Sequence, residues 1–562
     1  MQNEYNNYKN IHSDINECTS RGACSIAPNI ASLQEIIIYF LKQLSYYVIK
    51  LENLGANNQN IKYEIINDIA SLVSINEFSE KQLFEILSKD YFLFIDAKNT
   101  YHKICKEKSI PAKDLKNVII FDKNTSVSKA ISQGEKLFLE KYKQISQTQK
   151  NLMAILQILI KSTAISLIKL CEFKEFDDNV YHYILSTLDM FNHGKISNKD
   201  IKNRITKLSK IDCKLQIEIS DLLLKAYDGI EKVEVSHSTR RGKAILVSGN
   251  NFQDLLNVLE ATKEKNIDVY THSNLLITHA LNKFHQYPHL LGHYGNTTES
   301  CILDFATFPG SILLTKNSKN NTEYLYRGRL FSNDYIIHQG VVKVQDDDYT
   351  ELINAALNAK GFSKGKTKPS TTVGFNEKEI DDALNNLIVK LATNQIKHLY
   401  IIGLNYYSEI QNEYFREFFA NLKQDEFALS FSYKSKKDNV LTIDVGNYSP
   451  LIINILKKLF DKYPIDSKKI SFFFTGNSVL SASSSPRICS TRWRIAPAKL
   501  LPGITGTPFD VIWTKSGSFF FAAYCRILMP PFITRGTSIW SILLESGSAC
   551  SQLSSSSEAF SQ

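Results

Sequence analysis

The clearest hydrophobic pattern lies in the middle of the chain, over residues 244–279. Ala244 to Ser248 is a mostly apolar run that ends at Gly249, which is typical of a strand buried on both faces. Apolar residues then recur at helical spacing, at Phe252, Leu255, Leu256 and Leu259. A second short apolar run covers Ile267 to Tyr270. The pattern therefore predicts a strand–helix–strand unit with a parallel sheet in the middle of the protein.

Polar residues follow both of these predicted strands. Asn250 comes directly after the first strand, and His272 to Asn274 follow the second. Ligands of open parallel sheets bind at the carboxyl ends of the strands. We therefore expect any ligand of this unit to lie among these residues.

The first 235 residues have the pattern of helices. Apolar residues form one stripe from Ile36 to Val48, and Ser32-Leu-Gln-Glu35 just before them has the spacing of a capping box at a helix start. Further amphipathic stretches lie near residues 60–75, 79–108, 130–145, 147–175, 178–192 and 211–228. Because no convincing strand pattern precedes residue 240, residues 1–235 are predicted to form a helical-bundle domain.

The rest of the chain up to residue 480 alternates strands with helices, which predicts two Rossmann-like α/β domains with parallel sheets, over residues 236–375 and 376–480. In the first domain, SCILDFATFPGSILLT is expected to add one or two strands, and GFSKGKTKPSTTVGF reads as a linker. Strands are also predicted over 325–331, 341–344, 398–402, 427–431, 441–445 and 470–474, and helices over 349–358, 377–392, 409–422 and 450–462.

Composition narrows the class of protein. A chain of 562 residues is too long for one core and indicates about three domains. The net charge of +9 comes from lysines spread along the chain, which does not favour a nucleic-acid surface. The longest apolar stretch, Met153 to Cys171, contains Lys161 and Lys169, so we expect a buried helix and no membrane span.

The expected location is the cytoplasm. The first residues, MQNEYNNYKNIHSD, lack the apolar segment of a secretory signal. The nine cysteines are an odd number at scattered positions, so they do not make a disulfide framework. A reducing compartment is the simplest home for such a chain.

The composition changes abruptly after about Ser478. Residues 481–562 hold all three tryptophans, six of the thirteen prolines and no asparagine, and only two lysines against 52 before them. We hypothesise that this anomalous Ser/Pro-rich tail derives from a frameshift, a fusion or a sequence-assembly join. A native but divergent tail is the alternative.

Four segments of the α/β region resemble the hybrid cluster protein family. They are ILVSGNN, VYTHSNLL, HLLGHYG and FATFPGSILLTKNS, in that order and at the family's separations. The family comprises the hydroxylamine reductases and is related to the nickel carbon monoxide dehydrogenases. The resemblance extends over about residues 18–476 and implies two iron–sulfur centres, one of them a hybrid cluster that needs thiolates, a histidine and glutamates.

The positions that match the family's cluster ligands carry other residues in this chain. The family has a His in an SGHD-like turn, and this position corresponds to Asn250. The family's THGEM-like segment contains Gly-Glu, and these two positions correspond to Ser273 and Asn274. Four positions of family cysteines correspond to Ser318, Asn405, Tyr433 and Tyr448. The family's final Glu and Lys would fall near residues 476–480, where neither is present. We therefore expect that the chain does not assemble the hybrid cluster and that its cofactor content is none.

Cys18 and Cys24 resemble the second half of the family's amino-terminal four-cysteine motif, whose first half is absent. Two thiolates cannot hold a cubane cluster in one chain. A homodimer would supply two from each subunit, as carbon monoxide dehydrogenases do with a bridging cluster. The alternative is two thiols without a metal.

Histidines are concentrated between residues 272 and 293. His272 and His279 are candidate ligands for zinc or another transition metal, but the stretch contains no Asp or Glu to complete or orient a site. Ordinary, partly buried histidines are the alternative.

The sequence thus favours a hybrid-cluster-protein-like homologue that has lost the cluster and is not catalytic. Two alternatives stay open. One is an oxidoreductase of the hydroxylamine reductase or carbon monoxide dehydrogenase type, with a remnant or intersubunit iron–sulfur cluster. The other is a metal- or anion-binding module. No feature of the sequence identifies a partner.

Overall fold

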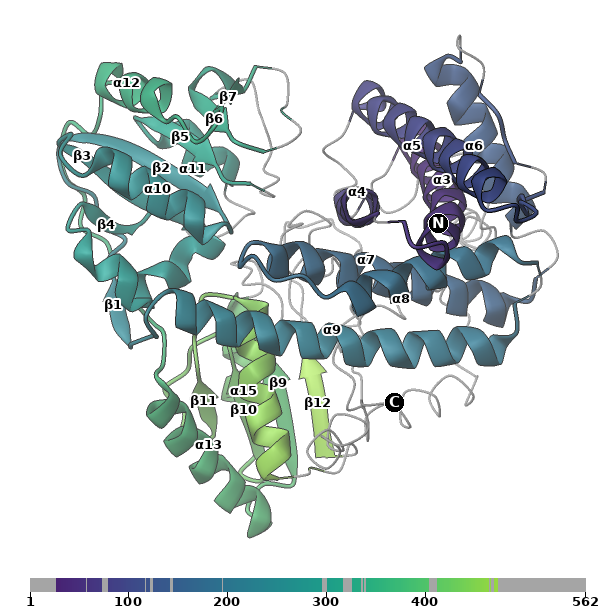
Figure 1. Ribbon diagram of the computed structural model, residues 1–562. Coiled ribbons are helices and arrows are strands. Elements are labelled where there is room, and N and C mark those ends of the chain that lie inside the picture. Colours follow the sequence, from purple (N-terminus) through teal and green to yellow (C-terminus); the bar gives the residue numbers. More distant parts are fainter. Residues whose placement is uncertain are drawn as a thin grey trace, which may run out of the picture. The chain divides into compact units, whose positions relative to one another are not determined.

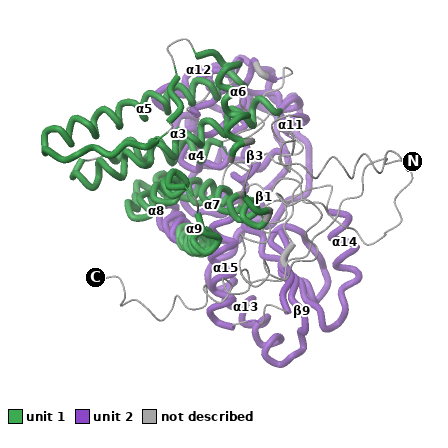
Figure 2. Tube along the Cα trace, turned by 90° about the vertical axis from the view of Figure 1, so that its right-hand side faces the viewer, with its two compact units in different colours: residues 1–215, 524–542 green, residues 216–523, 543–562 purple. Residues whose placement is uncertain are grey.

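A computed structural model of the chain describes residues 27–473, except for residues 57, 73–78, 117, 122–124, 142–144, 195, 296–300, 317–325, 335–336, 338–339, 404–411, 464 and 466–468. The contacts divide the chain into two compact units (Figure 2). One contains the described residues up to Leu215, and the other contains the described residues from Gln216 on. The described part of the fold consists of helices, two parallel sheets and a short antiparallel pair of strands (Figure 1).

The first unit is helical. Its helices are α3 (Pro28–Asn53), α4 (Gln59–Ser71), α5 (Glu80–Glu107), α6 (Val127–Lys141), α7 (Gln147–Cys171), α8 (Asp178–Asp189) and the first part of α9 (Asn198–Ala226). α3 packs against α5, α6 and α8. The apolar stripe predicted from Ile36 to Val48 is buried in α3, which confirms the helical reading of this region.

The predicted start of the first helix was wrong by one turn. α3 begins at Pro28, because proline suits the first helical position, where its missing N–H is not needed. Ser32 therefore lies inside the helix, and its hydroxyl donates to the Pro28 carbonyl at 2.9 Å rather than capping the helix. A capping box does occur at the start of α5, between Ser79 and Gln82.

α7 contains the long apolar stretch noted in the sequence. Over Thr148–Cys171 it is long and apolar enough to cross a membrane, and it is the one described helix of which this holds. In the structure, 76% of its apolar window is buried. This agrees with the expectation of a buried helix.

The second unit contains a six-stranded sheet in the order β4-β3-β2-β5-β6-β7, in which every neighbouring pair is parallel. The strands are β2 (Lys243–Gly249), β3 (Ile267–Ser273), β4 (Leu290–His293), β5 (Ser311–Leu314), β6 (Leu330–Ser332) and β7 (Val342–Lys343). β2 pairs with β3 over seven residues, from Lys243 opposite Ile267 to Gly249 opposite Ser273. The predicted strand–helix–strand unit is completed by α10 (Phe252–Thr262). α12 (Thr350–Asn358) packs on β2 and β5.

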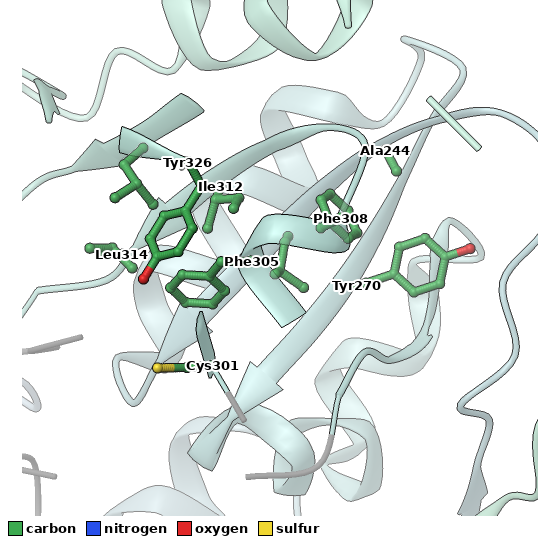
Figure 3. Close-up of a cluster of buried hydrophobic side chains, with 10 residues drawn as sticks. Ala244, Tyr270, Cys301, Phe305, Phe308, Ile312, Leu314 and Tyr326 are labelled. Atoms are coloured by element: carbon green, nitrogen blue, oxygen red, sulfur yellow. The ribbon is translucent and has the colours of Figure 1, made fainter. Parts of the chain in front are cut away.

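The segment SCILDFATFPGSILLT forms one strand, β5, and a helix that the sequence analysis missed. The helix is α11 (Cys301–Thr307). Cys301 and Phe305 are buried one helical turn apart, so the apolar residues here follow a helical and not a strand period. Both contribute to a buried cluster with Phe308 and Tyr326, beside the sheet residues Ala244, Tyr270, Ile312 and Leu314 (Figure 3).

A second parallel sheet follows, with four strands in the order β11-β10-β9-β12. These are β9 (His398–Ile402), β10 (Glu426–Ser430), β11 (Val440–Thr442) and β12 (Ile470–Phe473), with helices α13 (Glu377–Ala392), α14 (Asn412–Ala420) and α15 (Ser449–Lys462). Each of these elements lies within a few residues of the one predicted from the hydrophobic pattern.

The segment 361–375 is not the plain linker that its composition suggested. Its last part forms β8 (Thr371–Val373), which pairs antiparallel with β1 (Val233–Val235). Two further bridges join Gly242 to Phe362 and Thr239 to Lys366. The polar residues between these contacts concealed the short β-branched run Thr-Thr-Val that can pair as a strand.

The turn before β5 yields a prediction for stability. A Cβ added at Gly310 would lie 1.9 Å from the Ala244 carbonyl oxygen in β2, whereas a Cβ at Gly328 would meet nothing within 4 Å. We expect Gly310→Ala to lower the free energy of unfolding of the second unit by about 1–3 kcal/mol or more. Gly328→Ala, the matched control, should change it by less than about 0.5 kcal/mol. Denaturant titration of the full chain, followed by circular dichroism, measures both, and equal effects would contradict the packing described for this turn.

Candidate functional site

The end of β2 is held by buried hydrogen bonds. The backbone N–H groups of Asn250 and Asn251 donate to the Thr315 hydroxyl at 3.1 and 3.3 Å. The Asn251 side chain accepts from the Asp254 N–H at 2.9 Å and so caps α10. Asn250 is buried. The polar residues expected at this position are therefore part of a closed hydrogen-bonded turn.

The end of β3 has an unusual backbone conformation. Ser273 has φ +61° and ψ −135°, a region in which glycine is at home and a serine is strained. The 3₁₀ segment η2 (Asn274–Ala280) starts directly after it. Asn274, for which the sequence motif predicts correspondence to the family's glutamate, is half-buried at the start of this segment. The backbone at this turn thus has a conformation that favours glycine, although the residue there is Ser273.

A loop after β11 reaches the same end of the sheet. A Cβ added at Gly446 would lie 2.9 Å from the backbone nitrogen and from the Cβ of Ile277 in η2, so the two backbones are in close contact. The ring of Tyr448 is buried and lies 5.2 Å, centroid to centroid, from the ring of Phe252 at the start of α10. The structure therefore brings Tyr448 close to the turns that carry Asn250 and Asn274.

The same loop contains a buried carboxyl group. The Asp444 side chain accepts from the Gly446 N–H at 3.0 Å and lies 3.8 Å from the Lys434 ammonium. Burial raises the pKa of Asp444 to about 6, against the opposing effects of these two neighbours. Asp444 shapes the turn that precedes Tyr448.

Tyr433 occupies a different environment. Its ring is buried and lies 4.3 Å from the ring of Phe415 in α14. It belongs to the apolar cluster between α14 and the second sheet, with Tyr400, Ile402 and Phe419. A large aromatic side chain therefore fills the position for which the sequence motif predicts correspondence to a family cysteine.

Several predicted positions lie outside the described residues. They are Cys18, Cys24, Ser318, Asn405, residues 476–480 and the tail 481–562. For these positions the sequence-based expectations stay predictions.

The histidines form hydrogen bonds with hydroxyl groups. His272 Nδ1 lies 2.9 Å from Ser248 Oγ on the neighbouring strand. The Thr271 hydroxyl lies between two imidazoles, 2.8 Å from His279 Nε2 and 2.9 Å from His293 Nδ1. Within the described ranges, no group of three or more His, Cys, Asp or Glu side chains is arranged to hold a metal ion. His272 and His279 thus each have a hydroxyl partner, Ser248 for His272 and Thr271 for His279.

One carboxylate near the histidines was missed by the sequence analysis. Asp304 Oδ2 lies 3.3 Å from His272 Nε2, so it orients that imidazole from α11. Its carboxyl group also fills the space beside Gly295, where an added Cβ would lie 2.2 Å from Oδ2. Asp304 lies outside the stretch 272–293, in the segment that we had expected to be a strand, so its spacing gave no signal.

Burial keeps the central imidazoles neutral. It lowers the pKa of His279 to about 3 and the pKa of His293 well below its usual value, and the neighbouring imidazoles act in the same direction. The pKa of His237, whose ring lies 5.7 Å from that of His293, is also lowered, first by burial and then by Lys368. The environment of these three imidazoles therefore disfavours positive charge on them.

Comparisons with known proteins agree with the motifs. A model of the Prismane/CO dehydrogenase family matches residues 13–449, which is more than half of the chain. The chain belongs to the Prismane/CO dehydrogenase family. This confirms the resemblance inferred from the sequence segments around β2, β3, β4 and β5.

The similar curated proteins are named hydroxylamine reductase. The one from Thermodesulfovibrio yellowstonii is 26% identical over 436 residues, covering 74% of this chain and 76% of the relative. The one from Methanocella arvoryzae is 24% identical and covers 74% of this chain and 76% of the relative. The one from Zymomonas mobilis is 25% identical and covers 69% of this chain and 70% of the relative. A solved structure of acetyl-CoA synthase/carbon monoxide dehydrogenase alpha subunits, with NiZn[Fe4S4] and NiNi[Fe4S4] clusters, matches with a TM-score of 0.39 and 10% identity, over 83% of this chain and 76% of that one.

The strained turn at Ser273 gives a prediction. Glycine adopts φ +61° without a steric penalty, so we expect Ser273→Gly to raise the free energy of unfolding of the second unit by about 1 kcal/mol. Ser209→Gly, in the middle of α9, is the control and should lower stability by about 0.5–1 kcal/mol. Both values come from urea unfolding of the full chain. A loss of stability in Ser273→Gly would show that the turn is not strained.

The lowered pKa of His279 predicts sensitivity to acid. Because its folded-state pKa is about 3 and the unfolded value is about 6.5, the unfolded chain binds the extra proton throughout this interval. The stability contributed by the neutral imidazole is therefore fully present above about pH 6.5 and is lost as the pH falls, by at most about 1.4 kcal/mol per pH unit. We expect His279→Gln to reduce the dependence of the urea midpoint on pH in this range. A steeper slope in His279→Gln would contradict the account.

Proposed function

We propose that this chain is a non-catalytic homologue of the hydroxylamine reductases that does not hold the hybrid cluster. The observation that carries the proposal is the set of side chains at the matched ligand positions. Asn250 and Asn274 offer amides and Tyr433 and Tyr448 offer phenols, where the family's chemistry needs imidazole, carboxylate and thiolates. Neutral amides are poor ligands for iron, and the residues present do not fit the cluster.

Packing supports the same proposal. Tyr433 and Tyr448 are each about 1% exposed and lie against Phe415 and Phe252. A cysteine is much smaller than a tyrosine, so the rings take up space that a cluster would need. Either ring would have to leave its apolar contacts before a ligand could enter, at a cost of a few kcal/mol.

The backbone around these positions supports descent from a cluster-binding ancestor. Ser273 keeps a glycine-like conformation, and Gly310 and Gly446 keep close backbone contacts that no other residue would allow. We infer that selection preserved the scaffold after the ligands were replaced.

The alternatives rest on other residues. An intersubunit iron–sulfur cluster would depend on Cys18 and Cys24, and it would make the chain an oxidoreductase with a remnant cluster. A metal- or anion-binding module would depend on His272 and His279, which have Ser248 and Thr271 as hydrogen-bond partners. We also propose a cytoplasmic location, on the cysteine pattern of the sequence.

Metal analysis tests the proposal. We expect full-length protein purified without oxygen to contain far less than one iron and one sulfide per chain, and to consume hydroxylamine no faster than a blank with the same artificial reductant. The hydroxylamine reductase of Thermodesulfovibrio yellowstonii, prepared in parallel, is the positive control and must contain iron.

The double variant Cys18→Ser, Cys24→Ser separates the proposal from the remnant-cluster alternative. Stoichiometric iron in the unmodified chain that disappears in this variant would establish the intersubunit cluster. Stoichiometric iron that persists would show that donors elsewhere in the chain bind it. Either result would overturn the proposal.

A further inference from the structure

Two carboxyl groups are buried together in the helical unit, far along the chain from the matched ligand positions. Asp68 of α4 is 2% exposed, and Asp90 of α5 is fully buried. The two carboxyl groups are near enough that each acts on the pKa of the other. Among the described residues, no hydrogen-bond donor reaches either carboxyl oxygen of Asp90. Fully buried carboxyl groups of this kind are rare unless a partner compensates them.

The nearby charges compensate only one of the two carboxylates. The Lys89 ammonium lies 2.8 Å from one oxygen of Asp68 and 2.9 Å from the other, and it also lies 2.9 Å from Glu64. The charged groups that act on Asp90 are thus Asp68 and Glu64 from α4 and Lys89 from α5. From α3, which also packs on α5, the aromatic rings of Phe40 and Tyr47 face Phe94 and bring no charge.

Hydrogen-bond chemistry then dictates the protonation state. An ionised carboxylate only accepts hydrogen bonds, so two ionised groups in contact have no donor between them and repel each other. A single proton on one of them supplies the donor and removes one of the two negative charges. We propose that Asp68 and Asp90 bind one proton between them near neutral pH and that this shared proton holds α4 against α5. The helical unit therefore contains a proton-dependent latch.

The direction of the pKa shifts agrees with this geometry. Burial, followed by the charge of Asp68, raises the pKa of Asp90 well above its usual value, and burial also raises the pKa of Asp68 against the effect of Lys89. A carboxyl group whose pKa is raised on folding contributes stability that is fully present below its unfolded pKa of about 3.9 and is lost as the pH rises through the folded value. The latch is thus closed at low pH and opens on alkalinisation.

The latch is tested by hydrogen exchange of the full chain, followed by mass spectrometry of peptides from α4 and α5 over a range of pH. After correction for the intrinsic exchange rate, we expect the protection of these peptides to fall as the pH rises. In Asp90→Asn, which keeps the shape and removes the ionisation, protection should become independent of pH, and the melting temperature at alkaline pH should rise by about 2–4 °C. Glu64→Gln removes a carboxylate that also pairs with Lys89 but is not buried, and it should leave the pH dependence in place.

Infrared spectroscopy of the unmodified chain tests the proton itself, whether or not the variants fold. We expect the carbonyl stretch of a protonated carboxylic acid to persist at neutral pH and part of it to disappear in Asp90→Asn. Asp212→Asn is the control, because Asp212 is a further buried carboxyl group among the described residues of this unit, with a pKa raised to about 6. An unchanged carbonyl band in Asp90→Asn would overturn the proposal. The proposal would also be overturned if an added alkali or alkaline-earth cation stabilised the unmodified chain but did not stabilise Asp90→Asn.

Discussion

The parallel pairing of β2 with β3 is the constraint on which the candidate site depends. Seven residue pairs fix the register, so Ser248 lies beside His272 and Gly249 beside Ser273. A slip of one residue would turn the apolar side chains of a strand that is buried on both faces toward the wrong neighbours. The positions of Asn250 and Asn274 therefore follow from the packing of the strands before them and not from any ligand between them.

The interactions that hold this fold together are compatible with the proposal that the chain keeps the family's fold without its cluster. The buried strands, the close contact of Gly310 with Ala244 and the contact of Gly446 with η2 are interactions of backbone and apolar side chains. None of them needs a metal. The side chains at the strand ends can then change, provided that each new polar group finds a hydrogen bond and each new ring finds an apolar neighbour. Tyr433 and Tyr448 meet the second condition.

The sequence predicted the regular elements well and the local exceptions poorly. The helical period of α3 and the short apolar runs of β9 and β10 are signals of burial, and burial determines these elements. The pairing of β1 with β8 joins segments far apart in the chain, so no local pattern contains it. The interaction of Asp304 with His272 could not be predicted for the same reason, because a helix had to be placed first. At the site, the motifs allowed us to propose which residues stand at the ligand positions, but the packing of the two tyrosines required the fold.

The central claim is that amide and phenol side chains occupy the space in which relatives of this chain would hold iron. The most direct test is a crystal structure from protein made and crystallised without oxygen, with diffraction recorded on both sides of the iron absorption edge. The account predicts no anomalous iron peak near Asn250, Asn274 or Tyr448, and clear density for the Tyr448 ring against Phe252. An iron peak at that position, with the Tyr448 ring displaced and other donors around the metal, would contradict it.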